Sequence, residues 1–272
     1  MPALLEEKPN ALVPAILALD PLGDDLRVAI LVAAEAGFSG VALSVRHPTL
    51  AALRTSLTAR RHLRHTLASR GLKLACLRCS VPRANGRGIF DSAGVDRCID
   101  EVTAAIRLAW EFQAPLVEAY IGEPHSPALP AASFHGAVDA LAREADRAGV
   151  RVVLASGAVR LLADLLSLVN VPCLQANLDT LRLFTADGGV EESANILAGK
   201  IGLWTCADVI RIGGSIRTVE LGTGQAHPEK ILAVLRNQES TGPILIDVRD
   251  LPDPIHAAHR AAAVLRGIMR RS

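Results

Sequence analysis

The chain lacks the features of a membrane or secreted protein. No apolar run approaches the roughly 18 residues of a membrane-spanning helix. The amino-terminal segment MPALLEEKPN carries Glu6 and Glu7 where a signal peptide would be basic and then apolar. The five cysteines are an odd number, which fits a reducing compartment better than a disulfide scaffold. We therefore expect a cytoplasmic protein without a membrane partner.

An excess of charge of either sign is also missing. The 29 Lys and Arg residues nearly balance the 28 Asp and Glu residues, so nucleic acid is not an expected partner.

Cys76 and Cys79 form a CxxC motif, but they lie in LKLACLRC, an apolar run typical of a strand. Residues three apart on a strand point to opposite faces, so we expect buried small side chains rather than a zinc or redox site.

Short apolar runs instead alternate with longer amphipathic stretches along the whole chain. The runs are VPAILALD, GVALSVRH, LKLACLRC, LVEAYIG, VRVVLASG, CLQANLD, GLWTCADVI and PILIDVRD. Eight strands alternating with helices are the pattern of a (β/α)8 TIM barrel, an α/β fold of about 250 residues. With 272 residues, half of them hydrophobic, the chain is expected to form a single barrel domain over residues 1–272, with residues 1–11 as an amino-terminal tail.

Turn residues and helix caps divide this pattern into elements. Strands are expected at residues 12–20, 40–46, 72–79, 116–122, 150–157, 173–179, 203–207 and 244–248. Helices are expected at residues 24–36, 53–70, 92–113, 131–148, 161–169 and 228–238, and after the last strand. Asp24 is a plausible N-cap of the first helix and Gly37 its stop. The segment 81–88 is a candidate lid, and residues 211–227 are expected to be a long glycine-rich loop.

Five phrases of the sequence resemble those of a known family. They are AEAGFSGVALS, ADRAGVRVVLASG, NLDTLRLF, VELGTGQAHPEKILAVL and GPILIDVRD. In this order they resemble phrases at the second, fifth and sixth strands, before the last helix and at the last strand of xylose-isomerase-like sugar phosphate isomerases and epimerases. No single phrase is specific, but the ordered set spans almost the whole chain. The resemblance implies a TIM barrel and chemistry on sugar derivatives.

The resemblance also implies a divalent cation held by Glu, Asp, His and Glu at the barrel mouth. Four positions correspond to this set: Ala155 for the first Glu, Asp179 for the Asp, Thr205 for the His, and Asp247 for the last Glu. Three further positions depart from the family phrases: Ala42 for a Glu, Arg182 for a His, and His227 for an Asp. A Mg²⁺ or Mn²⁺ site needs several hard oxygen ligands. We therefore expect no bound metal and no other cofactor.

Alternation along each strand predicts which polar side chains enter the barrel. Taking the apolar face as the helix-facing one places twelve residues inside or at the mouth: Asp20, Ser44, Arg46, Arg78, Glu118, Tyr120, Gln175, Asn177, Asp179, Thr205, Asp247 and Arg249. An unusual share of the strand ends are arginines, and a buried arginine needs a carboxylate or a bound anion beside it.

Two interpretations of these arginines remain open. In the first, Arg46, Arg78, Arg182 and Arg249 bind a phosphate or carboxylate group, while Asp179, Glu118 or Asp247 transfers protons. In the second, the same arginines pair with the acidic residues across the mouth and replace the lost cation, leaving an electrostatic plug without substrate.

Other residues add weaker signals. His47 directly follows the second strand and is a candidate general acid or base, although a lone loop histidine is more often solvated. The glycines of GGSIRTVELGTG do not open a helix after a strand, so they form no dinucleotide motif, but their N–H groups could face an anion.

Two functions therefore compete. One is a sugar phosphate isomerase or epimerase-like enzyme that acts on a small anionic sugar or polyol, by proton abstraction next to a carbonyl, with arginines stabilising the enediolate. The alternative is a non-catalytic barrel that binds a small anion or pairs with an active subunit. The related apurinic endonucleases need a cluster of metal-binding residues that is missing here, so DNA repair is not expected. The sequence leaves open whether the chain is active and whether it forms a homo-oligomer.

Overall fold

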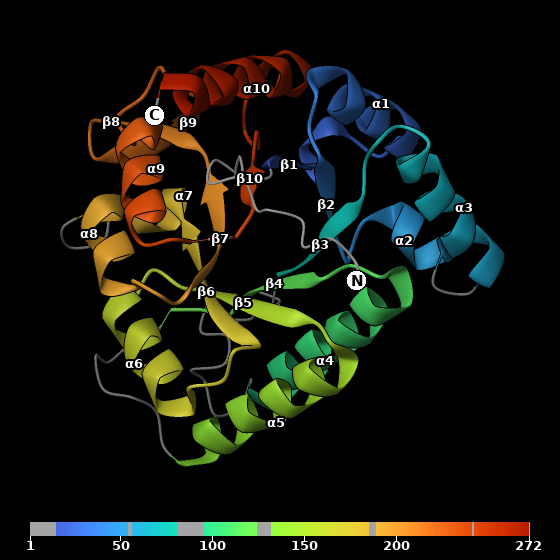
Figure 1. The fold of residues 1–272 in the computed structure, drawn as a ribbon, viewed down its shortest axis with the longest axis vertical. Helices are drawn as coiled ribbons and strands as arrows, with labels where there is room; N and C mark the ends of the chain where they lie inside the picture. Colours follow the sequence, from blue (N-terminus) through green and yellow to red (C-terminus); the bar gives the residue numbers. More distant parts are fainter. Residues whose placement is uncertain are drawn as a thin grey trace, which may run out of the picture.

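The computed structural model describes residues 15–53, 56–80, 95–123, 132–184, 189–240 and 242–271. In this part of the chain, eight parallel strands close into a barrel in the order β1, β10, β7, β6, β5, β4, β3 and β2. Figure 1 shows the helices as a ring around these strands, with α10 beside α1, so the ring closes between its last and first helices. The (β/α)8 barrel predicted from the sequence is confirmed.

The barrel strands are short and the outer helices longer. The strands are β1 (Ala15–Ala18), β2 (Gly40–Ser44), β3 (Leu74–Ser80), β4 (Leu116–Tyr120), β5 (Arg151–Ala155), β6 (Leu174–Asp179), β7 (Ile201–Cys206) and β10 (Ile244–Ile246). The helices are α1 (Leu26–Ala36), α2 (Pro48–Leu53), α3 (Leu57–Ala68), α4 (Val95–Phe112), α5 (Ala132–Ala148), α6 (Val159–Val169), α7 (Thr180–Leu183), α8 (Gly189–Ile196), α9 (Pro228–Asn237) and α10 (Pro254–Arg271). None of the helices in the described ranges is both long and apolar enough to cross a bilayer.

The start of the chain differs in detail from the prediction. Strand β1 ends at Ala18, and Asp20–Leu22 forms a 3₁₀ turn, so the strand is shorter than the predicted range 12–20. Helix α1 is capped by Asp25 rather than Asp24, because the Asp25 carboxylate accepts a hydrogen bond from the Arg27 N–H at 2.9 Å. Gly37 ends the helix with φ 82°, as expected. The predicted tail 1–11 and the candidate lid 81–88 lie outside the described residues.

The prediction of a long loop at residues 211–227 is wrong in its first half. Strands β8 (Asp208–Ile212) and β9 (Ser215–Val219) pair as an antiparallel hairpin outside the barrel. Gly213 and Gly214 form the two-residue turn between them, with φ values of 54° and 83°. Two consecutive positive φ values are what the tightest hairpin turns require, and glycine adopts them without strain.

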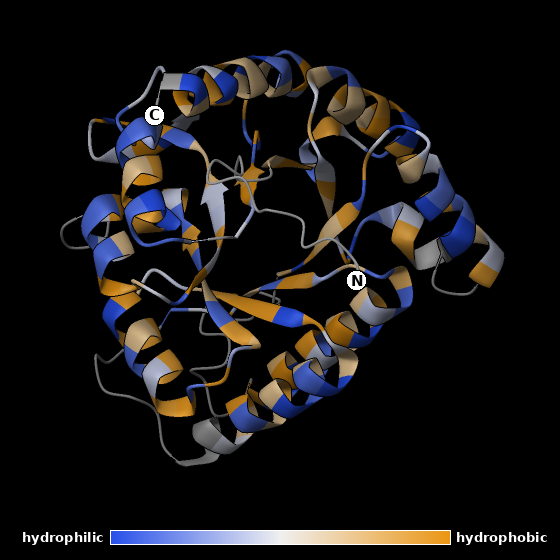
Figure 2. Ribbon diagram, viewed as in Figure 1, coloured by the Kyte–Doolittle hydropathy of each residue, from blue (hydrophilic) through white to orange (hydrophobic). Residues whose placement is uncertain are grey.

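The core has two layers, separated by the barrel wall. One side chain layer fills the interior: Ile16, Ala18, Ala42, Ala75, Cys76, Leu116, Val153, Leu203 and Leu245. A larger apolar layer lies between the strands and the helices, and Figure 2 shows hydrophobic and hydrophilic residues alternating along the outer helices. Cys76 belongs to the interior layer and Cys79 to the helix-facing layer, and both are buried, so the expectation of buried small side chains at the CxxC motif is confirmed.

Candidate functional site

Polar side chains form the next interior layer, at the carboxyl ends of the strands. Each lies two residues beyond an apolar interior residue, as strand alternation requires. The pairs are Cys76 and Arg78, Leu116 and Glu118, Leu203 and Thr205, and Leu245 and Asp247. In TIM barrels this end of the strands carries the active site. The expected grouping of Asp179, Thr205 and Asp247 at one end of the barrel is confirmed, because Asp179 is in register with Thr205 and within electrostatic range of Asp247.

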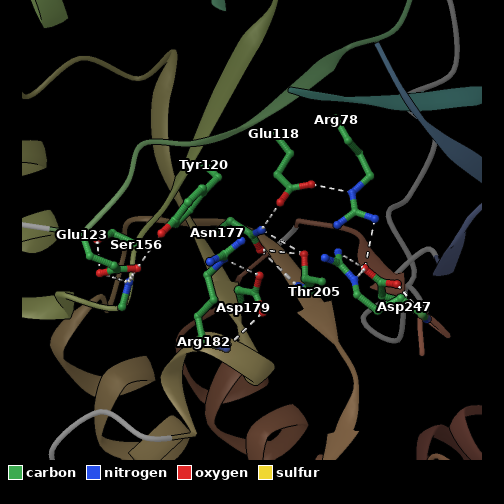
Figure 3. A network of polar contacts seen from close by, with 12 residues as sticks. Arg78, Glu118, Tyr120, Glu123, Ser156, Asn177, Asp179, Arg182, Thr205 and Asp247 are labelled. Carbon is green, nitrogen blue, oxygen red and sulfur yellow. Dashed lines mark hydrogen bonds and ion pairs between the residues drawn. The ribbon is translucent and has the colours of Figure 1, made fainter. Parts of the chain in front are cut away.

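Arg78 is the centre of a buried ion network. Its Nε donates to Glu118 Oε2 at 2.6 Å, and its Nη1 lies 3.0 Å from Asp247 Oδ2. The same Asp247 oxygen accepts from Arg249, whose Nε is 2.8 Å away. Figure 3 shows Glu118, Arg78 and Asp247 in this chain of contacts. Two arginines thus converge on the Asp247 carboxylate, as in the interpretation in which the arginines pair with acidic residues across the mouth.

Asn177 extends the network across the barrel. Its side-chain nitrogen donates to Glu118 Oε1 at 3.3 Å and to the Thr205 hydroxyl oxygen at 2.9 Å, while its carbonyl oxygen accepts from the Thr205 N–H at 3.1 Å. Strands β3, β4, β6 and β7 are therefore tied together by polar contacts, and the Glu118 carboxylate has a partner on each oxygen.

Asp179 and Arg182 form a second cluster beside the first. Asp179 ends β6 and caps the short helix α7, accepting from the Arg182 N–H at 3.3 Å, and its other oxygen lies 3.1 Å from Arg182 Nε. The Arg182 guanidinium stacks over the Tyr120 ring at 3.6 Å from its centroid (Figure 3). This geometry combines an ion pair with a cation–π contact, which fixes Arg182 in place.

Glu123 is a mouth residue that sequence reasoning missed. Its carboxylate accepts from the Gly157 N–H at 2.8 Å, from the Ser156 hydroxyl at 3.1 Å and from the Tyr120 hydroxyl at 3.3 Å (Figure 3). Glu123 follows β4 outside the strand, where alternation predicts nothing. The only signal available was its position just after a strand end, in a loop of the active-site face.

A cavity of about 300 Å³ opens beside the Arg78 network. It is lined by Asp20, Pro21, Ser44, Arg78 and Arg249. Both oxygens of Asp20 accept from the Ser44 N–H at 3.0 Å. Asp20 was expected to face the interior but was not among the candidate catalytic residues. Its carboxylate is the acidic group of this cavity.

The carboxylates of the mouth differ in their pKa values. Burial raises the pKa of Asp247, but Arg78 and Arg249 outweigh this effect and bring it to about 2. Burial raises the pKa of Asp179 above its usual value despite the charge of Arg182. Burial likewise raises the pKa of Asp20, against the Ser44 hydrogen bond and the charge of Arg78. Asp247 is thus a permanent anion, whereas Asp20 and Asp179 take up a proton more readily.

Two candidates lie in different surroundings from those expected. Arg46 does not face the barrel interior, because β2 ends at Ser44 and the exposed Arg46 side chain pairs with Glu101 of α4 at 3.2 Å. His47 is not solvated but 4% exposed, and its Nδ1 accepts from the Thr49 N–H at 3.2 Å. Its Nε2 is buried and has no hydrogen-bond partner within the described residues. The expectation of an inward Arg46 and the solvated alternative for His47 are both wrong.

The glycine-rich segment after β9 binds an anion of the protein itself. The buried Asp208 carboxylate accepts from the N–H groups of Gly222, Gly224 and Ala226 at 2.8, 2.9 and 3.1 Å. A side chain at Gly224 would place its Cβ 2.6 Å from the Val209 carbonyl oxygen. These N–H groups hold the loop on Asp208 and are not available to an external anion, which corrects the earlier suggestion.

The positions of the implied metal set can now be compared with a cation site. Ala42 and Ala155 are buried apolar residues, the Thr205 hydroxyl is bonded to Asn177, and Asp179 and Asp247 each contact a guanidinium group. His227 precedes α9 and its imidazole lies 3.5 Å from Glu229. Across the described ranges, no group of three or more His, Cys, Asp or Glu side chains is arranged to hold a metal ion.

Comparison with known structures agrees with the fold. A xylose isomerase domain protein from Planctomyces limnophilus is 20% identical, with a TM-score of 0.78 over 95% of this chain and 97% of its own. A xylose isomerase-like TIM barrel protein from Mycobacterium smegmatis, solved with magnesium, is 15% identical, with a TM-score of 0.73 over 95% and 97%. An L-ribulose 3-epimerase is 15% identical, with a TM-score of 0.76 over 96% and 95%. At these identities the likeness concerns the fold alone.

Sequence comparison identifies the family directly. Comparison with curated proteins gives no significant match. The family model of the xylose isomerase-like TIM barrel, however, matches residues 30–268, most of the chain. The chain therefore belongs to the xylose isomerase-like TIM barrel family.

Proposed function

We propose that this barrel binds a small sugar derivative or polyol in the cavity beside Asp20 and holds it without a divalent cation. The observation that carries the proposal is the double engagement of Asp247 by Arg78 and Arg249, both of which also line the cavity. Guanidinium groups are fixed donors for ligand oxygens, and Asp20 and Ser44 add acceptors for hydroxyl groups. A volume of about 300 Å³ is at the lower end of the range for small-molecule sites.

The residues present do not fit the family's divalent cation. Two carboxylates remain at the family positions, and each is already neutralised by a guanidinium within 3.1 Å. Adding a cation would place positive charge beside Arg78, Arg182 and Arg249, and a hard cation needs several oxygen ligands that are free to coordinate it. We therefore assign no step of the reaction to a metal.

The balance of charge favours a hydroxyl-rich ligand over a phosphate. With Arg46 outside the mouth, the three guanidinium groups of Arg78, Arg182 and Arg249 face five carboxylates, those of Asp20, Glu118, Glu123, Asp179 and Asp247. The formal charge of this group is negative by two when all are ionised. Of the three arginines, Arg249 has the most exposed side chain and is the group to which an anionic substituent would bind.

A catalytic role is favoured by the position of Asp20. A general base must lie close to the substrate, and its pKa must be high enough for it to accept a proton. Asp20 meets both conditions, because it lines the cavity and burial raises its pKa. Asp247, with a pKa of about 2, is a poor base and serves to orient the arginines. In this scheme Asp20 removes a proton next to a carbonyl, and Arg78 and Arg249 stabilise the resulting enediolate.

Ligand binding is tested by thermal denaturation with free ketoses and polyols, their phosphate esters and inorganic phosphate, each at millimolar concentration. A ligand that binds only the folded state raises the melting temperature by mass action. We expect a rise with a free ketose or polyol, which Arg249→Gln removes and Arg46→Gln, outside the cavity, retains. If neither sugars nor phosphates change the melting curve, the mouth is a plug of ion pairs and the proposal is wrong.

Catalysis is tested separately by hydrogen exchange at carbon. Any ketose that binds is incubated with the protein in D2O, and NMR measures deuterium entering next to the carbonyl. We expect exchange with the native chain and none with Asp20→Asn. Binding without exchange would identify the non-catalytic alternative.

A further inference from the structure

A second cavity lies at the opposite end of the barrel from the mouth. It has a volume of about 590 Å³, and Pro115 and Val150, which precede β4 and β5, form part of its wall. The charged and large apolar side chains of the wall are Leu57, Arg60, Arg61 and Arg64 of α3, and Trp110 and Glu111 of α4. We call it the lower cavity. None of these residues contributes to the network around Arg78.

The lower cavity has an excess of positive charge. Arg60 forms an ion pair with Glu111, and among the described residues that line the cavity Glu111 is the only acidic one. Arg61 and Arg64 have no ion-pair partner within the described residues. In the same described ranges, the buried Nε atoms of Arg60 and Arg64 lack an acceptor. Buried donors without an acceptor are unfavourable, so the protein itself leaves the arginines of this wall incompletely satisfied, and the charge of Arg61 and Arg64 is available to an anion in the cavity.

The same cavity exposes apolar surface. Leu57 is 67% exposed and Trp110 is 64% exposed, which makes them the two most exposed large hydrophobic residues in the described part of the chain. Aromatic and arginine side chains together in a concave site are typical of binding sites, because the ring packs on a flat ligand surface while the guanidinium binds its charge.

The neighbouring helix ends account for only part of this arrangement. Helices α4 and α5 end at Phe112 and Ala148, next to the cavity, and the carboxyl end of a helix carries about half a negative charge. Two such ends reduce the repulsion between the arginines. They provide no hydrogen-bond acceptor to Arg60 Nε or Arg64 Nε, and they do not explain the exposed Trp110.

We propose that the lower cavity binds a small organic anion with a flat apolar body, such as an aromatic phosphate or carboxylate. Arg61 and Arg64 bind the charged group, since guanidinium forks match phosphate and carboxylate oxygens, and Trp110 and Leu57 contact the apolar body. The site is independent of the sugar site proposed at the mouth, so either proposal can fail without the other.

The two tryptophans make binding measurable with the unmodified protein. Trp204 is 1% exposed and donates to the Thr180 hydroxyl at 2.9 Å, whereas Trp110 lines the cavity. Quenching of tryptophan fluorescence by acrylamide therefore reports mainly on Trp110. We use phenyl phosphate as the probe, with inorganic phosphate and phenol as its separate halves. Phenyl phosphate is expected to protect Trp110 and to bind more tightly than either half.

Variants locate the site. The double change Arg61→Gln and Arg64→Gln is expected to weaken phenyl phosphate binding about tenfold or more, since charge-assisted hydrogen bonds are lost. Arg97→Gln, on the exposed surface of α4, is the matched control and should bind as the native chain does. Arg249→Gln should also bind normally, which separates this cavity from the mouth. No protection by phenyl phosphate, or equal binding by the Arg61 and Arg64 variant, would overturn the proposal.

Discussion

Arg78 lies between Glu118 and Asp247, with its Nε 2.6 Å from one carboxylate and its Nη1 3.0 Å from the other. All three side chains are buried at the mouth of the barrel. The two carboxylates attract a positive charge, and Arg78 provides it as a covalently attached group. The pKa of Arg78 is raised well above its usual value, chiefly by Glu118 and then Asp247 against the opposing effect of burial, so this charge is permanent.

Replacing Arg78 by methionine should therefore destabilise the barrel. Arg78→Met leaves Glu118 and Asp247 without their shared partner, and loss of one member of a buried ion pair costs about 3–5 kcal/mol. The free energy of unfolding is measured by urea denaturation. As a control, Arg46→Met removes an exposed ion pair with Glu101 and is expected to change the free energy of unfolding by less than about 1 kcal/mol. Equal stability of the two variants would argue against a central role for Arg78.

Acid should remove the contribution of Asp247 to the stability of the folded chain. Its pKa falls from 3.8 to about 2 on folding, so its stabilising effect is complete above about pH 4 and is lost as the pH falls through 2. The shift corresponds to about 2 kcal/mol. The urea midpoint of the native chain, measured between pH 2 and 7, should fall as the pH drops from about 4 to 2. The Asp247→Asn variant should be less stable at pH 7 and should show a smaller fall over the same pH range. Asp250→Asn, at a neighbouring exposed position, should keep the native profile.

Gly224 should tolerate no side chain. An alanine Cβ there would be 2.6 Å from the Val209 carbonyl oxygen and would press on the Asp208 carboxylate that holds the loop. We expect Gly224→Ala to lower the melting temperature, since the loop must move and weaken buried hydrogen bonds. In the matched variant Gly136→Ala, the new Cβ meets open space on helix α5, and stability should rise by up to about 1 kcal/mol. A Gly224→Ala variant as stable as the native chain would contradict this account of the loop.

Strand alternation predicted the interior of the barrel well. Arg78, Glu118 and Asp247 follow apolar interior residues at a spacing of two, and the structure brings all three together. The same rule failed at Arg46, since β2 ends at Ser44 and a side chain beyond a strand need not follow its alternation. Beyond a strand end the rule is therefore unreliable rather than void, because Asp20 and Asp247, just past β1 and β10, still face the mouth.

Residues on loops were beyond this kind of prediction. Glu123 reaches Gly157 and Ser156 from another strand end, and such a contact depends on the closed barrel rather than on a local pattern. His47 is buried by tertiary packing that its sequence neighbours do not reveal. The hairpin β8–β9 had a local signal in Gly213 and Gly214, which the glycine-rich composition of the segment obscured.

The central claim is that guanidinium groups, and no divalent cation, balance the carboxylates of the mouth. Elemental analysis of the purified chain after dialysis, together with melting curves in EDTA, Mg²⁺ and Mn²⁺, tests it most directly. We predict far less than one metal ion per chain and the same melting temperature in all three solutions, because Asp179 and Asp247 already contact Arg182, Arg78 and Arg249. A nearly stoichiometric metal that survives dialysis, or a melting temperature that EDTA lowers and Mn²⁺ restores, would contradict the account.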